Sequence, residues 1–252
     1  MAWALITGAS SGLGIEFARL AAADGHDLVI SARSTDRLDT LAAEMPTQTV
    51  VIPADLSQPG AADRLWESAN DGRRIEILVN NAGLGIHGNL GRAPELERGT
   101  LSVNVVAATE LMQRALADFR DHGTRGRILN VASLAAFMPA PTMGLYHASK
   151  SYLLSLSEAV HHEAKAAGIT VTALCPGPTR TGFFDAAGLG NSGVARLMPL
   201  QSAPQVARAG WRGMMAGKRT VIPGLATKAL AVSTRVAPRG VMARVNKRFW
   251  NS

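Results

Sequence analysis

A tyrosine and a lysine, one helical turn apart, are the first residues of this sequence whose types and spacing point to chemistry. Tyr146 and Lys150 begin a helical pattern that runs to about Ala167, so their side chains lie on one helix face. A tyrosine with its ordinary pKa of about 10 is a poor base at neutral pH. A nearby ammonium group stabilises the phenolate and lowers that pKa. The pair therefore indicates proton transfer.

A serine adds an oxygen-holding group to this pair. Ser133 follows the apolar run Arg127–Val131, at the carboxyl edge where a parallel sheet places its ligand crevice. Its hydroxyl is suited to holding a substrate oxygen. A Tyr-x-x-x-Lys pattern alone is common, but its combination with Ser133 and a glycine-rich turn is far more specific.

The glycine-rich turn lies near the start of the chain. The apolar run Ala4–Thr7 leads into a segment with glycines at positions 8, 12 and 14, and a helical pattern follows at once. Glycines between a strand and a helix let backbone N–H groups approach a phosphate, and the helix N-terminus favours an anion. The spacing G-x3-G-x-G differs from G-x-G-x-x-G, and an ordinary turn is the alternative. The expected contacts of this turn are Gly8, Ser10, Ser11, Gly12, Leu13 and Gly14.

A basic residue occupies the position that reads the adenosine ribose of a dinucleotide. Arg33 lies 19 residues after Gly14, where an acid would hold the ribose 2′-hydroxyl of NAD. A guanidinium group favours a 2′-phosphate instead, so Arg33 predicts NADP(H). Ser34 and Arg37 are placed to assist, although Asp36 and Asp39 are near enough to pair with Arg37. The alternative is that Arg33 is a solvated loop residue.

Two further strand ends carry small or polar residues. Asp55, followed by Leu56, is placed either to accept from an adenine amino group or to cap the next helix. After the following apolar run, the segment Asn80–Gly83 would let the chain lie against the cofactor's ribose. The residues expected to do so are Asn81, Ala82 and Gly83. An ordinary turn is the alternative for this segment.

The elements that must position these residues alternate along the chain. Short β-branched runs are separated by segments with apolar residues at helical spacing, which predicts parallel strands with helical crossovers. The expected fold is a single doubly wound, Rossmann-like α/β domain over residues 1–223. The predicted strands are Ala4–Thr7, Leu28–Ser31, Thr49–Ile52, Ile75–Val79, Arg127–Val131, Ile169–Leu174 and Thr220–Ile222.

With these motifs the sequence resembles the short-chain dehydrogenase/reductase family, in the form whose chains have roughly 250 residues. The matching elements run in the family's order and are Thr7–Gly14, Asn80–Gly83, Asn104, Ser133, Tyr146 with Lys150, and Pro176–Thr181. The resemblance implies hydride transfer between NADP(H) and a ketone, an aldehyde or a secondary alcohol. It identifies Tyr146 as the general acid or base and Ser133 as the group that orients the substrate oxygen.

The same resemblance assigns the remaining contacts. Lys150 would lower the pKa of Tyr146 and bind the nicotinamide ribose, and Asn104 would hold a water that links Lys150 to solvent. Thr181 would meet the nicotinamide carboxamide, after a Pro176–Gly177 turn beneath the ring. Thr179 completes the expected cofactor contacts. An NAD-preferring enzyme of the same fold, or a cofactor-binding interaction protein, are the competing functions.

Composition limits the other classes of function. Apolar residues make up 47% of the 252 residues, so a disordered chain is excluded. The single cysteine, Cys175, excludes an internal disulfide, and is expected to be a buried thiol. No histidine has a partner at a metal spacing, so no metal is expected: His147 should point away from the catalytic pair, and His161 and His162 should be exposed.

The region after the catalytic helix is expected to cover the substrate. Residues 182–203 are rich in glycine and apolar side chains, which predicts a hinged lid over an apolar substrate. The glycines offered as hinges are Gly182, Gly188, Gly190 and Gly193, and the apolar residues are Phe183, Phe184, Leu189, Leu197, Met198 and Leu200. Met138, Met143 and Leu145 precede Tyr146 closely and are candidates to face the substrate.

The positive charge is confined to the C-terminal quarter. Residues 1–185 carry 15 Lys and Arg against all 19 Asp and Glu, whereas residues 186–252 carry 11 Lys and Arg and no acid. Nucleic-acid binding is therefore not expected, because the body is net acidic and the basic part lacks a recognition module. With no signal-like N-terminal pattern and no long apolar run, a cytoplasmic protein is expected. A homo-oligomer, dimer or tetramer, is expected as well.

Residues 224–252 form a basic appendage. A helical wheel begun after Pro238 groups Val241, Met242, Val245 and Phe249 in one sector, with Trp250 outside it. The bases Arg244, Lys247 and Arg248 fall in a separate sector. Such a helix packs either on its own domain or a sister subunit, or on an anionic membrane surface, which would place the protein peripherally on the inner membrane face.

Overall fold

The structure is a computed structural model that describes residues 2–183, 187, 200–234 and 237–251; for 239 and 248–251 it describes the backbone alone. Of the residues expected in the lid, those at 184, 188–190, 193, 197 and 198 lie outside the described residues.

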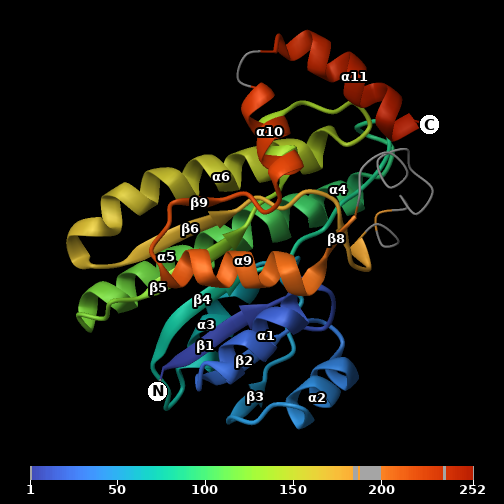
Figure 1. Cartoon of the computed structure of the whole chain (residues 1–252). Helices are drawn as coiled ribbons and strands as arrows, with labels where there is room; N and C mark the ends of the chain where they lie inside the picture. The colour runs from blue at the N-terminus through green and yellow to red at the C-terminus, as the bar shows by residue number, and fades with distance from the viewer. Residues whose placement is uncertain (1, 184–186, 188–199, 235–236, 252) are drawn as a thin grey trace.

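The centre of the molecule is a parallel sheet of seven strands (Figure 1). Its order is β3-β2-β1-β4-β5-β6-β9, so the direction of winding reverses between β1 and β4. The strands are β1 Trp3–Thr7, β2 Asp27–Ser31, β3 Thr49–Val51, β4 Ile75–Asn80, β5 Arg127–Val131, β6 Thr170–Leu174 and β9 Thr220–Val221. Such a reversal places a ligand crevice at the carboxyl ends of the strands.

Helices cover both faces of this sheet, because alternate strand residues carry apolar side chains to opposite sides. Leu5 packs with one set of helices, and its neighbours Ala4 and Ile6 pack with the other. The first set comprises α3 Ala61–Asn70, α5 Ala108–Asp121 and α6 Gly144–Ala164, and the second comprises α1 Leu13–Ala23, α2 Thr35–Ala43 and α9 Ala203–Met215. The α/β doubly wound prediction is confirmed.

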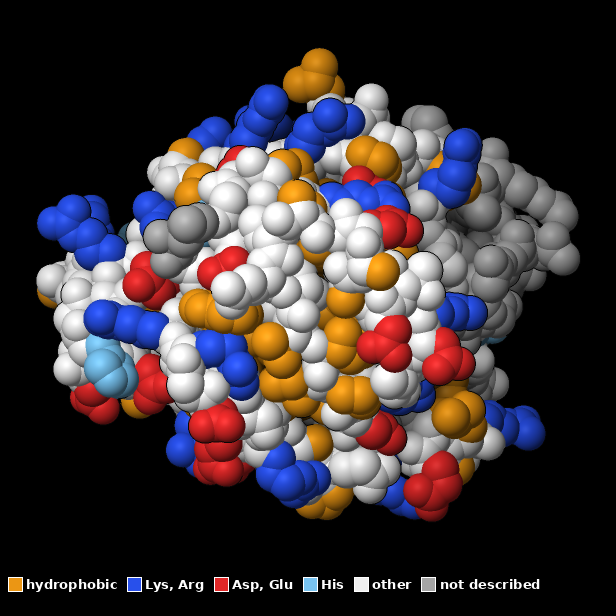
Figure 2. All heavy atoms as spheres, turned by 90° about the horizontal axis from the view of Figure 1, so that it is seen from below, with side chains coloured by type: hydrophobic (Ala, Val, Ile, Leu, Met, Phe, Trp, Pro, Cys, Tyr) orange, Lys and Arg blue, Asp and Glu red, His pale blue; other side chains and the backbone are white. Residues whose placement is uncertain are grey.

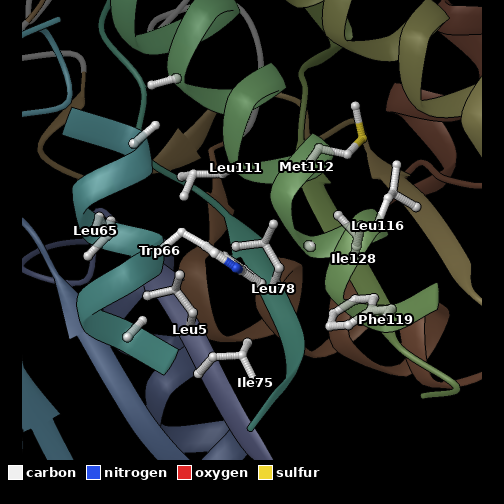
Figure 3. Close-up of a cluster of buried hydrophobic side chains, with 14 of the residues drawn as sticks. Leu5, Leu65, Trp66, Ile75, Leu78, Leu111, Met112, Leu116, Phe119 and Ile128 are labelled. Atoms are coloured by element: carbon white, nitrogen blue, oxygen red, sulfur yellow. The ribbon is translucent and has the colours of Figure 1, made fainter. Parts of the chain in front are cut away.

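The core beneath α3 and α5 is drawn in Figure 3. Leu78 of the sheet packs against Trp66 and Leu111 of these helices, and all three side chains are buried. Trp66 also donates from Nε1 to Asp118 Oδ2 at 2.6 Å, which ties α3 to α5. This packing fixes the helices that carry the loops of the site.

A short interruption lies in the helical segment before α5. The helix α4 Pro94–Leu101 continues into a π-helical turn, Ser102–Ala107, which contains Asn104. Turns of this kind are rare and commonly lie at functional sites. A 3₁₀ turn, Leu134–Phe137, follows β5 and Ser133.

The strand predictions agree with the structure to within one residue at nearly every end. A second, two-stranded parallel sheet was not predicted: β7 Thr179–Arg180 pairs with β8 Gln201–Ser202. These strands are two residues long, too short for a periodic pattern to reveal. The predicted catalytic helix is α6, and its last turn, Lys165–Ala167, is a 3₁₀ helix.

The chain ends in two helices, α10 Leu225–Ser233 and α11 Arg239–Asn251, at the opposite end of the molecule from α2 and β3 (Figure 1). As expected, α11 begins directly after Pro238. Its Met242 packs toward Leu134 and Met138, and Asn246 Nδ2 donates to Pro139 O at 2.8 Å. One face of α11 therefore packs on the chain's own domain. None of the helices in the described part of the chain is long and apolar enough to cross a bilayer.

Candidate active site

A cavity of about 700 Å³ lies at the carboxyl ends of the central strands. The loops that follow β1, β2, β3, β4, β5 and β6 all contribute to its wall. Of the predicted site residues, those that line it are Gly8, Ser10, Ser11, Gly12, Leu13, Arg33, Asp55, Leu56, Asn81, Ala82, Gly83, Ser133, Tyr146, Lys150, Pro176, Gly177, Thr179 and Thr181. Gly14 and Asn104 lie behind this wall.

The glycine turn is built for close approach. Gly12 has a φ of +54°, and a Cβ there would lie 2.9 Å from Thr181, so a side chain would be both strained and blocked. A Cβ on Gly14 would overlap the Gly8 carbonyl oxygen. Gly14 therefore closes the turn from within and does not line the cavity, unlike the expectation from sequence.

Two side chains that join β1 to β4 hold this turn. The hydroxyl of Thr7, which is buried, accepts hydrogen bonds from the backbone N–H groups of Asn81 at 3.1 Å and Ala82 at 3.0 Å. The Asn81 amide donates to the carbonyl oxygens of Thr7 and Gly8 at 3.0 and 3.1 Å. Asn81 therefore shapes the glycine turn as well as lining the cavity.

The end of the cavity beyond β2 is positively charged. Arg33 and Arg37 are exposed at its rim, and neither forms an ion pair with the described residues. The pairing of Arg37 with Asp36 or Asp39, which the sequence left open, is therefore not formed among the described residues. Ser34, at the N-terminus of α2, also lines the rim, and its side chain makes no capping bond.

Asp55 stands close to this basic rim. Its Oδ1 accepts from Ser57 N at 3.0 Å and Ser57 Oγ at 2.7 Å, and these bonds, with help from the Arg33 charge, lower the pKa of the carboxyl. It does not cap α3, whose first turn follows Gly60. Of the two roles left open by the sequence, the capping of that helix is excluded.

The three catalytic candidates lie together and are largely withdrawn from water. Ser133 hydrogen-bonds Tyr146, and Lys150 donates from Nζ to Val131 O at 2.8 Å. The Lys150 Nζ lies 5.8 Å from the centroid of the Tyr146 ring. Tyr146 and Lys150 are both buried. The Ser133 hydroxyl and the Lys150 ammonium group are therefore both placed beside Tyr146.

The electrostatics differ from the expectation that Lys150 lowers the pKa of Tyr146. Burial raises the pKa of Tyr146 to about 12, and the Ser133 hydrogen bond opposes this only in part. Burial also lowers the pKa of Lys150 to about 8. For both residues, the cost of burying the charged form away from water outweighs the attraction between the Tyr146 phenolate and the Lys150 ammonium group. Tyr146 is consequently held as a neutral proton donor.

The side chain of Asn104 is held by hydrogen bonds within the protein and does not line the cavity. Its Oδ1 accepts from Leu84 N at 2.8 Å, and its Nδ2 donates to Leu84 O at 2.8 Å and Ser149 Oγ at 3.0 Å. Gly83 lies between Asn104 and Lys150, since a Cβ there would be 3.5 Å from Asn104 Oδ1 and 3.3 Å from Lys150 Nζ. The side chain of Asn104 therefore fixes the loop after β4 and the catalytic helix relative to each other.

The remaining cofactor candidates follow β6. The Pro176 carbonyl accepts from Leu134 N at 2.8 Å, which brings this turn beside Ser133. Thr179 is buried and donates to Gly177 O at 2.9 Å, and Thr181 packs on Gly12. The turn thus joins the glycine-rich end of the cavity to its catalytic end.

The substrate end of the cavity is mainly apolar. Phe183 packs on Tyr146 with 5.1 Å between ring centroids, and Met138 also lines the wall. Met143 is buried behind Tyr146, and Leu145 lines a different pocket, so neither forms this wall. The C-terminal helices supply wall residues that the sequence did not indicate: Leu230, Met242, Val245 and Asn246. These residues are far from the catalytic residues in the sequence, so the folded structure is needed to show that they line the cavity.

Three histidines and one cysteine are the other reactive side chains that the sequence analysis considered. His147 was expected to point away, but it is buried, lines the cavity and contacts Met138 O through Nδ1 at 2.7 Å. His161 is half-buried rather than exposed, and His162 is exposed as expected. Cys175 is buried, which raises the pKa of its thiol to about 12. Among the described residues no three His, Cys, Asp or Glu side chains are grouped as metal ligands.

Comparison with known proteins identifies this arrangement. The family model for short chain dehydrogenases matches residues 2–192. The chain belongs to the short-chain dehydrogenase family. It is accordingly an oxidoreductase of CH–OH and C=O groups with a nicotinamide cofactor.

Individual relatives are similar over most of this short-chain dehydrogenase. A 7beta-hydroxysteroid dehydrogenase of Collinsella aerofaciens is 32% identical over 184 residues, which is 71% of this chain and 69% of the relative. A short-chain dehydrogenase from Sphingobium yanoikuyae, solved in complex with NADPH, is 33% identical with a TM-score of 0.84, covering 96% of this chain and 95% of that one. A bulky-bulky ketone specific alcohol dehydrogenase from Comamonas testosteroni is 30% identical with a TM-score of 0.79, covering 96% and 94%.

Proposed function

We propose that this short-chain dehydrogenase transfers hydride between NADP(H) and an apolar ketone, aldehyde or secondary alcohol. The observation that carries the proposal is the continuity of the cavity. A single space runs from the guanidinium groups of Arg33 and Arg37, past the glycine turn, to Ser133, Tyr146 and Lys150. NADP(H) carries its 2′-phosphate at the adenosine end and its reactive nicotinamide ring at the other end, with the pyrophosphate between them.

The residues present fit such a cofactor. The open backbone of Gly12 and the hydroxyls of Ser10 and Ser11 would hold the pyrophosphate at the start of α1. Lys150 would hold the nicotinamide ribose, and Thr181 the carboxamide. The cofactor would supply the hydride and accept it in the reverse direction.

The protein's own groups handle the proton. In carbonyl reduction Ser133 donates a hydrogen bond to the substrate oxygen, and the neutral Tyr146 hydroxyl donates the proton that this oxygen acquires. In alcohol oxidation the phenolate of Tyr146 takes the proton back. Lys150 carries a positive charge close to the phenolate and stabilises it, while burial of Tyr146 and Lys150 excludes competing water.

The basic rim favours NADP(H) over NAD(H). A 2′-phosphate would meet two guanidinium groups without ion-pair partners among the described residues, with the Ser34 hydroxyl and the N-terminus of α2 beside them. The ribose hydroxyl of NAD would leave these charges without an anion. The NADPH bound to the Sphingobium relative supports the same preference.

The substrate end favours bulky apolar compounds. Met138, Phe183 and Met242 supply much of its wall, and its polar groups include Tyr146, Ser133, His147 and Asn246. Two of the relatives act, by their names, on hydroxysteroids and on bulky ketones, which agrees with this wall.

We place the protein in the cytoplasm as a homo-oligomer.

Binding of the two cofactors tests the proposal. The wild-type protein is expected to bind NADPH more tightly than NADH, and Arg33→Asp is expected to narrow or reverse the difference. Loss of a charge-assisted contact is worth roughly 1.5–3 kcal/mol, or about tenfold or more in Kd. Lys218→Asp, far from the cavity, is the matched control and leaves the ratio unchanged. Equal wild-type affinities would contradict the proposal.

A further inference from the structure

The helices α10 and α11 carry large apolar side chains that are exposed. Leu225 is 87% exposed and Val232 is 55% exposed on α10, and Val241 and Val245 are 46% and 40% exposed on α11. We call Leu225, Val232, Val241 and Val245, with the exposed bases Lys228, Arg244 and Lys247, the C-terminal surface. Single exposed apolar residues are ordinary, but four on two consecutive helices need an explanation.

The charge of this segment is of one sign. Residues 224–252 contain six Lys and Arg and no Asp or Glu. On the face drawn in Figure 2, by contrast, the two signs are mixed, and red and blue side chains are interspersed. A surface that combines exposed apolar groups with unopposed bases is complementary to an anionic lipid headgroup layer.

The orientation of α11 leaves these groups available. Met242 and Asn246 face the domain, so this face of the helix is already occupied. Val241, Arg244 and Lys247 lie on the remaining, exposed sector. The apolar sector expected from sequence is therefore divided: Met242 packs inward and Val241 stays in water. The side chains of 248–250 lie outside the described residues.

The C-terminal surface also adjoins the active site. Val245 is 40% exposed and at the same time lines the cavity, together with Leu230, Met242 and Asn246. We propose that the C-terminal surface docks on anionic lipid bilayers. Docking in this orientation sets the α11 wall of the cavity against the bilayer, next to an apolar phase.

Co-sedimentation of the full-length protein with vesicles tests the proposal. The protein is expected to sediment with an equal mixture of phosphatidylglycerol and phosphatidylcholine at low salt, and to stay in the supernatant with phosphatidylcholine alone. High salt is expected to release it, because screening shortens the reach of the bases. Failure to sediment with the anionic vesicles at low salt overturns the proposal.

Charge reversal locates the binding surface. The triple variant Lys228→Glu, Arg244→Glu, Lys247→Glu is expected to lower the vesicle partition coefficient by about tenfold or more. The control variant Lys165→Glu, Arg212→Glu, Lys218→Glu changes the net charge equally, at exposed positions in the segments that precede β6 and β9, near the amino ends of these strands. It is expected to bind as the wild type does. Equal losses in the two triple variants overturn the proposal.

The apolar part has its own test. Leu225→Gln with Val241→Gln is expected to weaken binding to the anionic vesicles while leaving turnover of a water-soluble ketone unchanged, since neither residue lines the cavity. The subunit number of each variant is measured by light scattering. If these changes alter the subunit number and leave vesicle binding intact, the C-terminal surface is an interface between copies and the proposal is wrong.

Discussion

At the residue scale, the protonation of Tyr146 sets what the site can do at neutral pH. Its pKa, raised by burial to about 12, keeps the hydroxyl protonated, so the acid needed for carbonyl reduction is always present. The base needed for alcohol oxidation is the minor form. Lys150, with a pKa lowered to about 8, is a cation below that pH and loses its charge above it.

These values predict opposite pH profiles for the two directions. The kcat/KM for alcohol oxidation is expected to rise about tenfold per pH unit from neutrality toward pH 8, as the phenolate fraction grows. The kcat/KM for ketone reduction is expected to stay level there and to fall above about pH 8, as Lys150 loses its proton. Initial rates in both directions in one buffer series measure this. Parallel profiles would contradict the assignment.

Residue types and spacings predicted most of the cavity wall. Arg33, Ser133 and Tyr146 were found because each follows a strand or begins a helix at a position where a parallel sheet gathers its ligand groups. The bonds of Thr7 and Asn81 across β1 and β4 could not be predicted, because these partners are more than 70 residues apart in the chain. The balance of burial and charge at Tyr146 likewise depends on packing that no motif encodes.

At the scale of elements, α11 acts as a wall of the substrate cavity. It is fixed by the packing of Met242 and by one hydrogen bond from Asn246 to Pro139 O. The sequence predicted the helix and its start after Pro238, since basic and apolar residues there follow a helical period. It could not predict which face of α11 packs on the domain, because Val241, Met242 and Val245 are all apolar and lie close together on the helical wheel.

Loosening this wall is expected to change substrate binding more than chemistry. Asn246→Ala removes the bond to Pro139 O, at a cost of about 1 kcal/mol of local stability. KM for a bulky ketone is expected to rise several-fold, with kcat for a small ketone nearly unchanged. Arg244→Ala, two residues earlier and exposed, is the control. A loss of kcat for small and bulky ketones alike would show that α11 supports the catalytic groups instead.

At the scale of the whole molecule, a second exposed apolar area lies on the helices beyond the site. Leu101, Val106 and Tyr152 are exposed, and Tyr152 OH lies 3.1 Å from Thr109 Oγ1, which joins α5 to α6. Facing helices with such side chains suit association with a second copy. The strands and the helix layers were predictable from apolar periodicity, whereas the order of the strands and the subunit number depend on contacts that periodicity does not describe.

Light scattering tests this association. The wild-type protein is expected to be a dimer or tetramer, and Val106→Asp with Tyr152→Asp is expected to shift it toward smaller species. Leu90→Asp, at another exposed leucine, serves as the control and leaves the assembly intact. A monomeric wild-type protein would show that these side chains are merely exposed.

The most direct test of the whole account is the turnover of Tyr146→Phe with NADPH and a bulky ketone, followed at the absorbance of NADPH. The variant keeps the ring and loses only the transferable proton. The account predicts that it binds NADPH as the wild type does and that kcat falls by roughly 10²–10⁴-fold, the scale of a general acid. Near-normal turnover would contradict it, because another group would then be donating the proton.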